Sequence, residues 1–564
     1  MKKDNRSIIV FIIISLITFI FIVYGSELST ETVLSTNAGT KLIVKKSNSF
    51  IEYSSEDNVF IIDEEDIIYI SPDILSEHLN TKAYFDPEDK IAIITTLDKV
   101  IRFYGETFKV KINNDEVDYI KPMIISDGVP LIPITQIKEY LNLETVILEE
   151  NNRIIIRSLY DSEVVGEAVY SKIVLKKDKS MWSEIVEVLD SDNNIKIVGE
   201  DDGWLRVFTN HGSNAFIKKN RLKNFKEIEG IEMEVSSSIW RPENDKILLT
   251  WESVYSKNPD TRQIKEMDGL NVISPTWIEL RSSSGNIKSN VSKSYINWAK
   301  KRGYKVWALF SNSFDPKLTD KFLNNSVARE KTIDRLLKLL KENNMDGINI
   351  DFENVYLKNK ELLVQFVREL TPIFHENGLV VSIDVTVIGG SDNWSNFLDR
   401  KALGKVVDYM AVMTYDEHWA TSPKSGSVAS IGWVERGIER ILEEVPAEKL
   451  LLGVPFYTRI WTEIPSSANP DKVTVKSKAI SMKVARKILG RDDITKVWDE
   501  EAGQYYISYV ENNKLNKIWF EDAKSIKLKT DLVKKFNLAG VAAWRRGFET
   551  EEIWSTIDSN INEK

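Results

Sequence analysis

From about Lys246 onwards, apolar runs alternate with amphipathic helical segments, and this alternation restricts the fold more than any other feature of the sequence. Apolar strands of this kind are covered on both faces, and the helices that connect parallel strands supply that cover. The segments between the runs space their apolar residues three and four positions apart, as at Leu363, Phe366 and Leu370. The runs predict these strands: Ile247–Trp251, Asn271–Leu280, Val306–Asn312, Gly347–Glu353, Val380–Val387, Tyr409–Asp416, Leu450–Tyr457 and Leu538–Trp544.

Eight strands and their helices over about 320 residues fit an α/β fold, the (β/α)8 TIM barrel, in which active sites form at the carboxyl ends of the strands. An insertion at about residues 463–529 separates the seventh strand from the eighth. A doubly wound sheet would also alternate strands and helices, but no glycine-rich phosphate turn follows the first strand. The sequence therefore predicts a barrel domain over residues 240–564.

Ahead of the barrel, residues 27–160 contain a faint internal repeat that predicts a mixed α+β domain. Each repeat is a strand, a short amphipathic helix and then a hairpin. The two repeats are Ile70–Asn80 with Lys90–Thr95 and Ile132–Asn142 with Arg153–Arg157. This arrangement resembles the domain named after the amino-terminal domain of copper amine oxidases, which is common in bacterial wall proteins, and implies a spacer or wall-binding module. The name implies no copper here, because the segment holds one histidine and no cysteine.

Residues 164–225 predict a second unit, a small all-β barrel with polar turns between its strands. The expected strands are Gly166–Leu175, Ile185–Leu189, Ile195–Val198, Gly203–Phe208 and Asn214–Ile217. Asp202, Gly203 and Trp204 open the fourth strand, and this order resembles bacterial Src-homology-3-like domains, which often bind wall peptides or glycans. A small barrel with a purely structural role is the equal alternative.

The first 26 residues predict a membrane anchor or a signal segment. Three basic residues precede the unbroken apolar run Ile8–Tyr24, which favours an amino terminus that stays in the cytoplasm. We expect an uncleaved single-pass anchor in the cell membrane, with the bulk of the chain extracellular. Cleavage beside the small residues Gly25 and Ser26, which would give a secreted or wall-associated protein, is the alternative.

Composition excludes several classes of function. The net charge of −10 argues against a nucleic-acid partner, since such binding draws on clustered Lys and Arg. The chain has no cysteine, which excludes disulfides, thiolate metal sites and cysteine nucleophiles. Its four histidines, His78, His211, His375 and His418, are scattered, so we expect no metal ion and no cofactor.

The stretch DGINIDFEN at residues 346–354 carries the clearest chemical signal. Side chains alternate faces along a strand, so Asn349, Asp351 and Glu353 point the same way. Burying carboxyls on an apolar strand is costly and therefore needs a reason. Catalysis supplies one, because one carboxyl can protonate a leaving group while its neighbour stabilises positive charge. The structural alternative is a strand end where these polar residues simply meet water. The preceding turn at Asp346 and Gly347, and the motifs downstream, favour the chemical interpretation.

Four motifs lie at the carboxyl ends of predicted barrel strands, and together they resemble the family 18 glycoside hydrolases. They are DGINIDFEN, Met413–Asp416, Gly453–Tyr457 and Gly540–Trp544, and the resemblance covers about residues 246–554. The segments that flank these motifs resemble those of the subgroup of spore and cell-wall lytic enzymes. They are Tyr415–Trp419, Ser427–Gly432 and Ile518–Asp522. That subgroup implies a polysaccharide substrate, peptidoglycan or cortex glycan, cleaved at an N-acetylglucosamine linkage.

Two functions of other kinds stay open beside a glycosidase. A non-catalytic, glycan-binding wall protein could keep the barrel, although such relatives typically lose the acid glutamate and Glu353 is present. A structural wall tether could depend mainly on the small amino-terminal modules. Within the enzyme class, a chitinase acting on unmodified chitin is the alternative to a wall-lytic enzyme.

The resemblance implies a role for each motif residue. Glu353 would be the general acid and would later activate water, whereas the nucleophile would be the substrate's own 2-acetamido oxygen. Asp351 would hold the amide N–H and stabilise the oxazolinium cation. Tyr415 would donate its hydroxyl to the acetamido oxygen. Trp544 would form the apolar floor of the cleavage site.

The resemblance also implies residues that line the cleft. Asp416, Tyr457 and Met413 would line it. Asn349 departs from the family pattern, where an aspartate is common and would share a proton with Asp351. Because an asparagine cannot ionise but can donate a hydrogen bond to Asp351, we expect a shifted pH profile rather than lost catalysis.

Overall fold

The computed structural model describes residues 39–562 except 47–48, 80, 106, 119, 150–151, 191–194, 209–211, 213, 232–238, 243–245, 466–472 and 512–513. The chain divides into two compact units. The first unit contains the described residues up to Ala83, with 103–110 and 117–233, and the second contains 84–102, 111–116 and 234 onwards. The predicted anchor Ile8–Tyr24 lies outside the described residues.

Among the described residues, no helix combines the length and the apolar character that crossing a membrane requires.

The amino-terminal part of the first unit is built from two small sheets. One has the order β12-β13-β1-β2 and places β1 parallel to β13, so that Leu42 pairs with Ile154. The other has the order β10-β11-β4-β3, with helices α2 (Pro72–His78) and α3 (Ile134–Ile137) following β4 and β11. The strands are β1 (Lys41–Lys46), β2 (Ser49–Ser54), β3 (Phe60–Ile62), β4 (Ile68–Ile70), β10 (Ile124–Ser126), β11 (Val129–Pro133), β12 (Leu143–Leu148) and β13 (Arg153–Ser158). The predicted strand–helix repeat is thus present twice, at β4–α2 and β11–α3.

The rest of the first unit is an antiparallel sheet with the order β16-β15-β19-β18-β17-β14-β20. Its strands are β14 (Glu163–Ala168), β15 (Lys172–Lys176), β16 (Ile185–Asp190), β17 (Ile195–Asp201), β18 (Trp204–Phe208), β19 (Asn214–Lys218) and β20 (Leu222–Ile228). A core that includes Leu175, Val207 and Ala215 fills its interior. The β-rich character of this region is as predicted, and its likeness to a Src-homology-3 domain stays a prediction.

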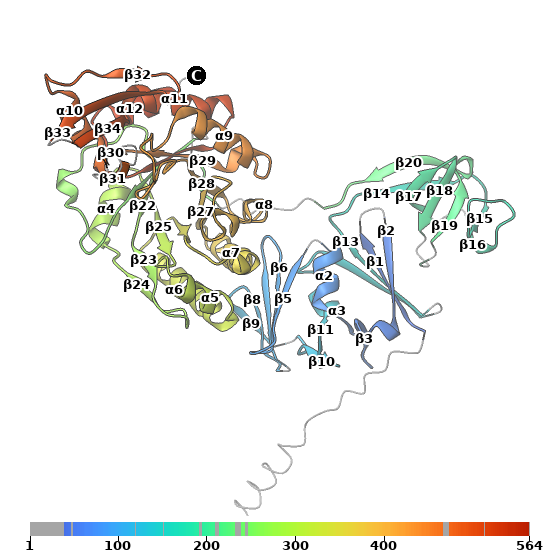
Figure 1. Cartoon of the computed structure of the whole chain (residues 1–564). Coiled ribbons are helices and arrows are strands. Elements are labelled where there is room, and N and C mark those ends of the chain that lie inside the picture. The colour runs from blue at the N-terminus through green and yellow to red at the C-terminus, as the bar shows by residue number, and fades with distance from the viewer. Residues whose placement is uncertain are drawn as a thin grey trace, which may run out of the picture. The chain divides into compact units, whose positions relative to one another are not determined.

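The second unit contains the predicted barrel. Within the described part of the chain, eight parallel strands close in the order β21-β22-β25-β26-β27-β28-β29-β35, and β35 pairs back to β21 (Figure 1). They are β21 (Ile247–Glu252), β22 (Val272–Pro275), β25 (Lys305–Ser311), β26 (Gly347–Asp351), β27 (Val380–Thr386), β28 (Tyr409–Met413), β29 (Leu450–Pro455) and β35 (Gly540–Trp544). Side chains such as Trp251, Trp307, Leu309, Ala411 and Leu451 form one cluster of the core. The (β/α)8 prediction is confirmed.

Helices cover the outside of the barrel, as the apolar spacing predicted. They are α4 (Lys293–Lys301), α5 (Pro316–Leu323), α6 (Ser326–Glu342), α7 (Lys360–Glu376), α8 (Arg400–Gly404), α9 (Ile431–Leu442), α11 (Ala523–Lys535) and α12 (Ile553–Asn562). Helix α6 begins after Asn325, whose side chain accepts a hydrogen bond from the Ala328 N–H and caps the helix. Buried Leu336 and Leu340 of α6 lie one turn apart on the inner face.

The second predicted strand, Asn271–Leu280, is broken in the structure. Strand β22 ends at Pro275, and a separate strand β23 (Ile278–Leu280) pairs with β24 (Ile287–Ser289) in an antiparallel hairpin. Proline has no N–H with which to continue a ladder, so the chain can turn away at this point. The single long strand was therefore a wrong prediction.

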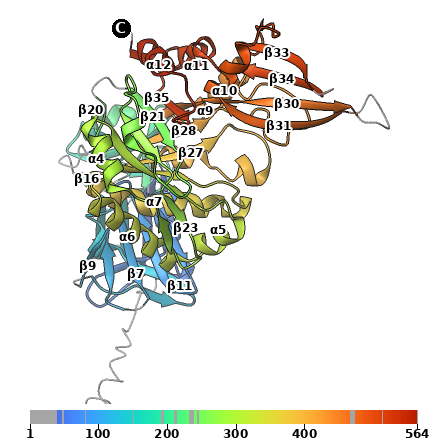
Figure 2. The same ribbon diagram turned by 90° about the vertical axis from the view of Figure 1, so that its left-hand side faces the viewer.

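The predicted insertion between the seventh and eighth strands forms a sheet with the order β31-β30-β34-β33-β32. Its elements are β30 (Tyr457–Pro465), β31 (Val473–Ser481), α10 (Met482–Leu489), β32 (Val497–Asp499), β33 (Gln504–Glu511) and β34 (Lys514–Phe520). Figure 2 shows the β30–β31 hairpin running outwards from the barrel. Because β30 begins two residues after β29 ends, residues at its start belong to both the barrel rim and the insertion.

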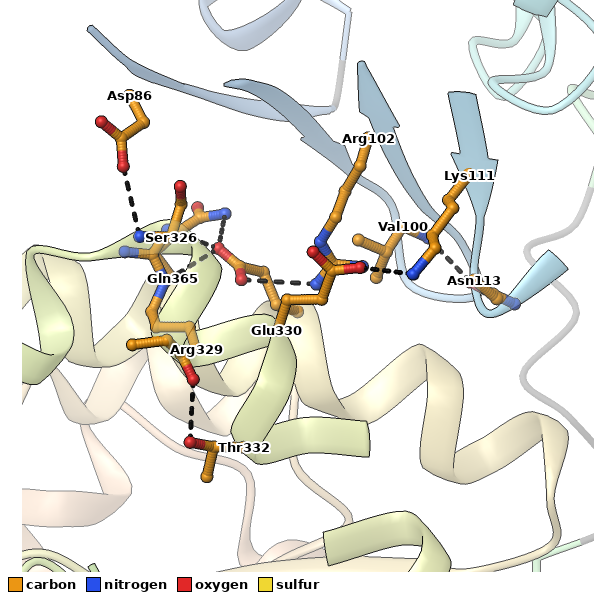
Figure 3. A network of polar contacts seen from close by, with 12 residues as sticks. Asp86, Val100, Arg102, Lys111, Asn113, Ser326, Arg329, Glu330, Thr332 and Gln365 are labelled. Atoms are coloured by element: carbon orange, nitrogen blue, oxygen red, sulfur yellow. Dashed lines mark hydrogen bonds and ion pairs between the residues drawn. The ribbon is translucent and has the colours of Figure 1, made fainter. Parts of the chain in front are cut away.

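A further sheet, with the order β5-β6-β7-β8-β9, supplies residues 84–102 and 111–116 to the barrel unit. Its strands are β5 (Lys82–Asp86), β6 (Ile91–Thr95), β7 (Val100–Tyr104), β8 (Val110–Ile112) and β9 (Asp115–Val117). Figure 3 shows Arg102 and Lys111 of this sheet reaching towards helix α6, where Lys111 pairs with Glu330 at 2.7 Å. Asp86 accepts a hydrogen bond from the Ser326 N–H at the start of the same helix.

Candidate active site

Strand β26 carries the first candidate residues into the barrel interior. Asn349 is fully buried and pairs in register with Leu309 of β25 and Ser382 of β27, and Asp351 is 8% exposed. The strand can lie this close to β27 because it begins at Gly347, where a Cβ atom would lie 2.6 Å from the Val380 carbonyl oxygen. The sequence prediction that Asn349 and Asp351 share one face of a strand is consistent with this placement.

The Asn349 side chain is held by a network of buried groups. Its Nδ2 donates to Asp384 Oδ1 at 2.8 Å, and its Oδ1 accepts from Trp251 Nε1 at 2.9 Å and from Ser274 Oγ at 3.1 Å. The expected hydrogen bond from Asn349 to Asp351 was wrong. Residues two apart on one strand are separated by about 7 Å, whereas a side chain on the adjacent strand lies closer.

Asp351 has a buried and unsatisfied carboxyl group. Its Oδ1 has no hydrogen-bond partner among the described residues. Burial, with the nearby charges of Glu353 and Asp384, raises the pKa of Asp351 well above its ordinary value. A buried acceptor without a partner is costly in a folded protein, and such an atom at a strand end is suited to receive a donor from a ligand.

Glu353 lies just beyond the end of β26 and is positioned through its backbone. Its N–H donates to Asn312 Oδ1 at 3.1 Å, and Asn312 Nδ2 donates to the Glu353 carbonyl oxygen at 2.8 Å. Asn312 is itself fully buried and also bonds Thr319 at 2.9 Å. Burial, with the charge of Asp416, raises the pKa of Glu353 to about 7. Glu353 can therefore hold a proton near neutral pH and release it, as a general acid must.

The turn after β28 and the start of β30 contribute a second group. Tyr457 donates its hydroxyl to Asp416 Oδ1 at 2.6 Å, and Arg459 Nη2 lies 3.3 Å from the same oxygen. The Tyr415 ring lies 6.2 Å from that of Tyr457 in an edge-on arrangement. Burial, with the charge of Asp384 next, raises the pKa of Tyr415 well above its ordinary value, so its hydroxyl stays a donor.

Two further predicted residues lie at the ends of barrel strands. Trp544 ends β35, is partly buried, and lies with its ring 5.9 Å from that of Trp251. Met413 ends β28, is partly buried and pairs in register with Thr386. Seven of the eight predicted site residues thus lie at, or within two positions of, an end of a barrel strand or the start of β30, and Asp416 lies three positions after β28. Hydrogen bonds join Asn349 to Asp384 and Tyr457 to Asp416.

The sequence analysis missed several residues of this cluster. Asp384 is the clearest, since it is the one charged residue within β27 (VVSIDVT) and is 3% exposed. The criterion that selected DGINIDFEN, a carboxyl inside an apolar strand, would have selected it too. Asn312 and Arg459 gave no comparable signal, because their roles depend on contacts between distant segments. Among the described residues, no group of three or more His, Asp or Glu side chains could hold a metal ion.

Comparison with known proteins adds two family matches. The profile of the Glycosyl hydrolases family 18 matches residues 251–549, and the profile of the Copper amine oxidase N-terminal domain matches residues 33–156. The first match covers seven of the eight barrel strands, the last two residues of β21 and every candidate site residue. The second covers the predicted strand–helix repeat.

Individual relatives match about half of this chain. An uncharacterized glycosylase, YvbX, of Bacillus subtilis (strain 168) is 28% identical over 286 residues, which are 49% of this chain and 80% of that protein. A cortical fragment-lytic enzyme of the same organism is 28% identical over 258 residues, 45% of this chain, and the match spans only 58% of that enzyme. The crystal structure of the Bacillus megaterium QM B1551 spore cortex-lytic enzyme SleL shares the fold, with a TM-score of 0.50 and 23% identity over 56% of this chain and 74% of that one.

Proposed function

The chain belongs to family 18 of the glycosyl hydrolases, and from this premise we propose that it is a retaining glycosidase that cleaves glycans containing N-acetylglucosamine. The proposal rests on one observation above all. The end of β26 places Glu353, whose pKa is raised to about 7, two residues from Asp351, whose buried Oδ1 has no partner among the described residues. A proton donor and an unsatisfied acceptor thus lie two residues apart at the carboxyl end of β26.

Glu353 is the proposed general acid. It protonates the glycosidic oxygen, so that the bond from this oxygen to the anomeric carbon breaks, and the resulting carboxylate then activates water. Asn312 supports this role because it fixes the Glu353 backbone from both sides. Burial raises the pKa of Glu353, and the like charge of Asp416, which Tyr457 and Arg459 hold in place, raises it further, so that the carboxyl can carry a proton near neutral pH.

Asp351 and Tyr415 are the proposed groups for substrate-assisted attack. The 2-acetamido oxygen of the sugar bonds to the anomeric carbon and forms an oxazolinium cation, which water then opens with net retention. Asp351 Oδ1 is free to accept the acetamido N–H, and the protonated Tyr415 hydroxyl can donate to the acetamido oxygen. Asp351 and Glu353 project from the same side of the cleavage point, so neither serves as a nucleophile on the opposite face of the sugar.

Trp544, Met413, Tyr457 and Asp416 are the proposed lining residues. The exposed part of Trp544 offers a flat apolar face, which suits the apolar face of a pyranose ring. Its position beside buried Trp251 limits its movement. We propose that the sugar at the cleavage point rests on Trp544.

The proposed substrate is peptidoglycan or spore cortex glycan rather than chitin. Two B. subtilis proteins similar to about half of this chain are a glycosylase and a cortical fragment-lytic enzyme, which supports a wall glycan. The amino-terminal modules are the proposed spacer or wall-binding elements, and residues 1–26 are the proposed membrane anchor. The chain would then act on glycan outside the cell.

Glu353→Gln tests this function, because it keeps the shape of the side chain and removes the transferable proton. Wild-type protein should release fragments with reducing-end N-acetylglucosamine from purified peptidoglycan or cortex, as read by mass spectrometry. The variant should be slower by about 10²–10⁴-fold. Asp392→Asn, which changes an exposed carboxyl at the start of the short π-helix Asp392–Asn396 after β27, is the matched control and should retain activity.

Three results would contradict the proposal. Activity of Glu353→Gln within about tenfold of wild type removes Glu353 from the acid role. Cleavage of chitin oligomers without release from wall glycan makes the protein a chitinase. Glycan binding by the wild type, with no fragments released from any of these substrates, makes it a glycan-binding protein.

A further inference from the structure

A second buried carboxyl lies inside the barrel, one strand away from the motif that family resemblance identifies. Asp384 is on β27, next in sequence to Ile383, which pairs in register with Ile350. The position after that pair places Asp384 beside Asp351. Because side chains alternate along parallel strands, both carboxyls face the barrel interior. Asp384 is 3% exposed.

Both oxygens of Asp384 are held by neutral donors. Asn349 Nδ2 donates to Oδ1 at 2.8 Å, and Trp251 Nε1 donates to Oδ2 at 3.1 Å. The same Trp251 N–H also reaches Asn349 Oδ1, so three residues on three strands fix one another. Asn349, which departs from the common family residue, is therefore the link between Asp384 and the catalytic strand.

Other acids face this carboxyl. The titratable groups that act on Asp384 or are acted on by it are Asp351 and Glu353 of the β26 end and Tyr415 of the turn after β28. Among these described neighbours none is a cation. Burial raises the pKa of Asp384 to about 8, although the hydrogen bonds from Asn349 and Trp251 lower it in part, and the charge of Glu353 also raises it. Two buried carboxyls without a cation cannot both ionise at low cost, so they titrate as a pair.

We propose that Asp384 is a positioning residue that supplies, from the adjacent strand, the second carboxyl which Asn349 cannot provide, and that Asp351 and Asp384 together retain one proton and one negative charge. The inference rests on the proposed function. The hydrogen bonds from Asn349 and Trp251 stabilise the ionised form of Asp384 and leave the shared proton on Asp351 in the resting site. The negative charge of the pair then stabilises the oxazolinium cation.

Asp384→Asn is the primary test, because it keeps the shape of the side chain and one of the two acceptor oxygens, and removes one charge. Like charges raise one another's pKa, so removing one lowers the pKa of the carboxyls that remain. The alkaline limb of kcat/KM should move to lower pH by on the order of one unit. The value of kcat should fall by about 10²-fold, with little change in KM, since Asp384 does not touch the substrate.

Two further variants distinguish a positioning role of Asp384 from a role in the packing of the barrel alone. Ser382→Ala alters the same inward face of β27 without changing charge, and it should leave the pH profile in place. The double variant Asn349→Asp with Asp384→Asn exchanges acid and amide across one hydrogen bond. It should recover the wild-type pH profile and most of the lost kcat, whereas Asn349→Asp alone adds a third carboxyl and should lower the melting temperature.

The infrared spectrum of the wild type provides a test that does not depend on turnover. At pH 7 it should show protonated-carboxyl bands of which one is lost in Glu353→Gln and another in Asp351→Asn. A spectrum from which Asp351→Asn removes no protonated-carboxyl band would overturn the inference. An unshifted pH profile in folded Asp384→Asn, or a double variant no better than the single one, would overturn it as well. If the wild type cleaves substrate but the variants or the spectrum give these contrary results, the role of Asp384 is refuted and the proposed function stands. A wild type that cleaves no substrate contradicts the proposed function itself.

Discussion

Replacing Glu369 with glutamine should lower the free energy of unfolding of the barrel unit by about 3–5 kcal/mol, because two buried guanidinium groups lose their counter-charge. Glu369 lies on α7 and is fully buried, as is Arg329 on α6. Arg102 of β7 is 1% exposed. Breaking such a pair is costly because the remaining charge stays in a medium that solvates it poorly.

The contacts predict that the two arginines contribute unequally. Arg329 Nη2 and Nε lie 2.8 and 3.2 Å from Glu369 Oε1, and Arg329 also lies over the Tyr84 ring at 4.7 Å. Arg102 approaches Oε2 at only 3.4 Å, and its Nε has no partner among the described residues. Arg329→Met should therefore cost about as much as Glu369→Gln, whereas Arg102→Met should cost about 0–1.5 kcal/mol.

The measurement is urea unfolding followed by tryptophan fluorescence, with equal m-values as the criterion that the variants unfold comparably. Glu342→Gln is the matched control, because it removes an exposed carboxyl of α6 whose contact with Lys338 is 3.8 Å long. That control should change the free energy by less than about 0.5 kcal/mol. A Glu369→Gln cost below about 1 kcal/mol, or an Arg102→Met cost equal to it, would refute the reasoning.

Three other predictions concern catalysis and the amino terminus. The value of kcat/KM should fall as pH rises through about 7, because Glu353 then loses its proton. Asp416→Asn should move this fall to lower pH, because it removes a like charge that raises the pKa of Glu353. A fall at the same pH in that variant would contradict the effect of Asp416 on Glu353. Substrates without the 2-acetamido group should not turn over, a thiazoline mimic should inhibit competitively, and NMR early in the reaction should show the β anomer; inversion would remove Asp351 and Tyr415 from their roles. Deleting residues 1–26 should release an active protein from the membrane fraction, whereas a shortened, freely released mature chain in wild-type cells would establish a cleaved signal.

The barrel could be predicted from the sequence because its determinants are local. Apolar runs with helical spacing between them located all eight barrel strands, including β26 and β35. The break after Pro275 was missed, because an apolar run on either side of the proline still resembles one strand. The contact of Arg102 with Glu369 joins residues 267 positions apart, and no local pattern indicates it. The predicted amino-terminal domain therefore gave no sign that residues 84–102 pack with the barrel helices.

The candidate site shows the same division between what is local and what is not. Motifs at strand ends predicted Asp351, Glu353 and Tyr415 as one group, because parallel strands bring their carboxyl ends to one edge. In the structure the charges of Asp351 and Glu353 act on Tyr415. The hydrogen-bond partner of Asn349 was predicted wrongly. The sequence identifies Asp351 as the next residue on the same face of the strand, but it does not indicate which residue of the adjacent strand lies beside Asn349. In the structure Asn349 donates its hydrogen bond to Asp384 of the adjacent strand.

The pairing of Asn349 with Asp384 also explains how a departure from a family motif need not remove a charge from a site. Residues 349 and 384 are joined by one hydrogen bond, so a carboxyl at either position occupies nearly the same region of the barrel interior. The carboxyl can therefore be supplied by either strand. The electrostatic requirement, one negative charge beside Asp351, is kept while the residue that meets it moves from β26 to β27. Chains with asparagine at the position of Asn349 should therefore carry an acid at the position of Asp384 more often than chains with aspartate there. Equal frequencies in the two groups would mean that Asp384 serves the packing of this barrel and not its chemistry.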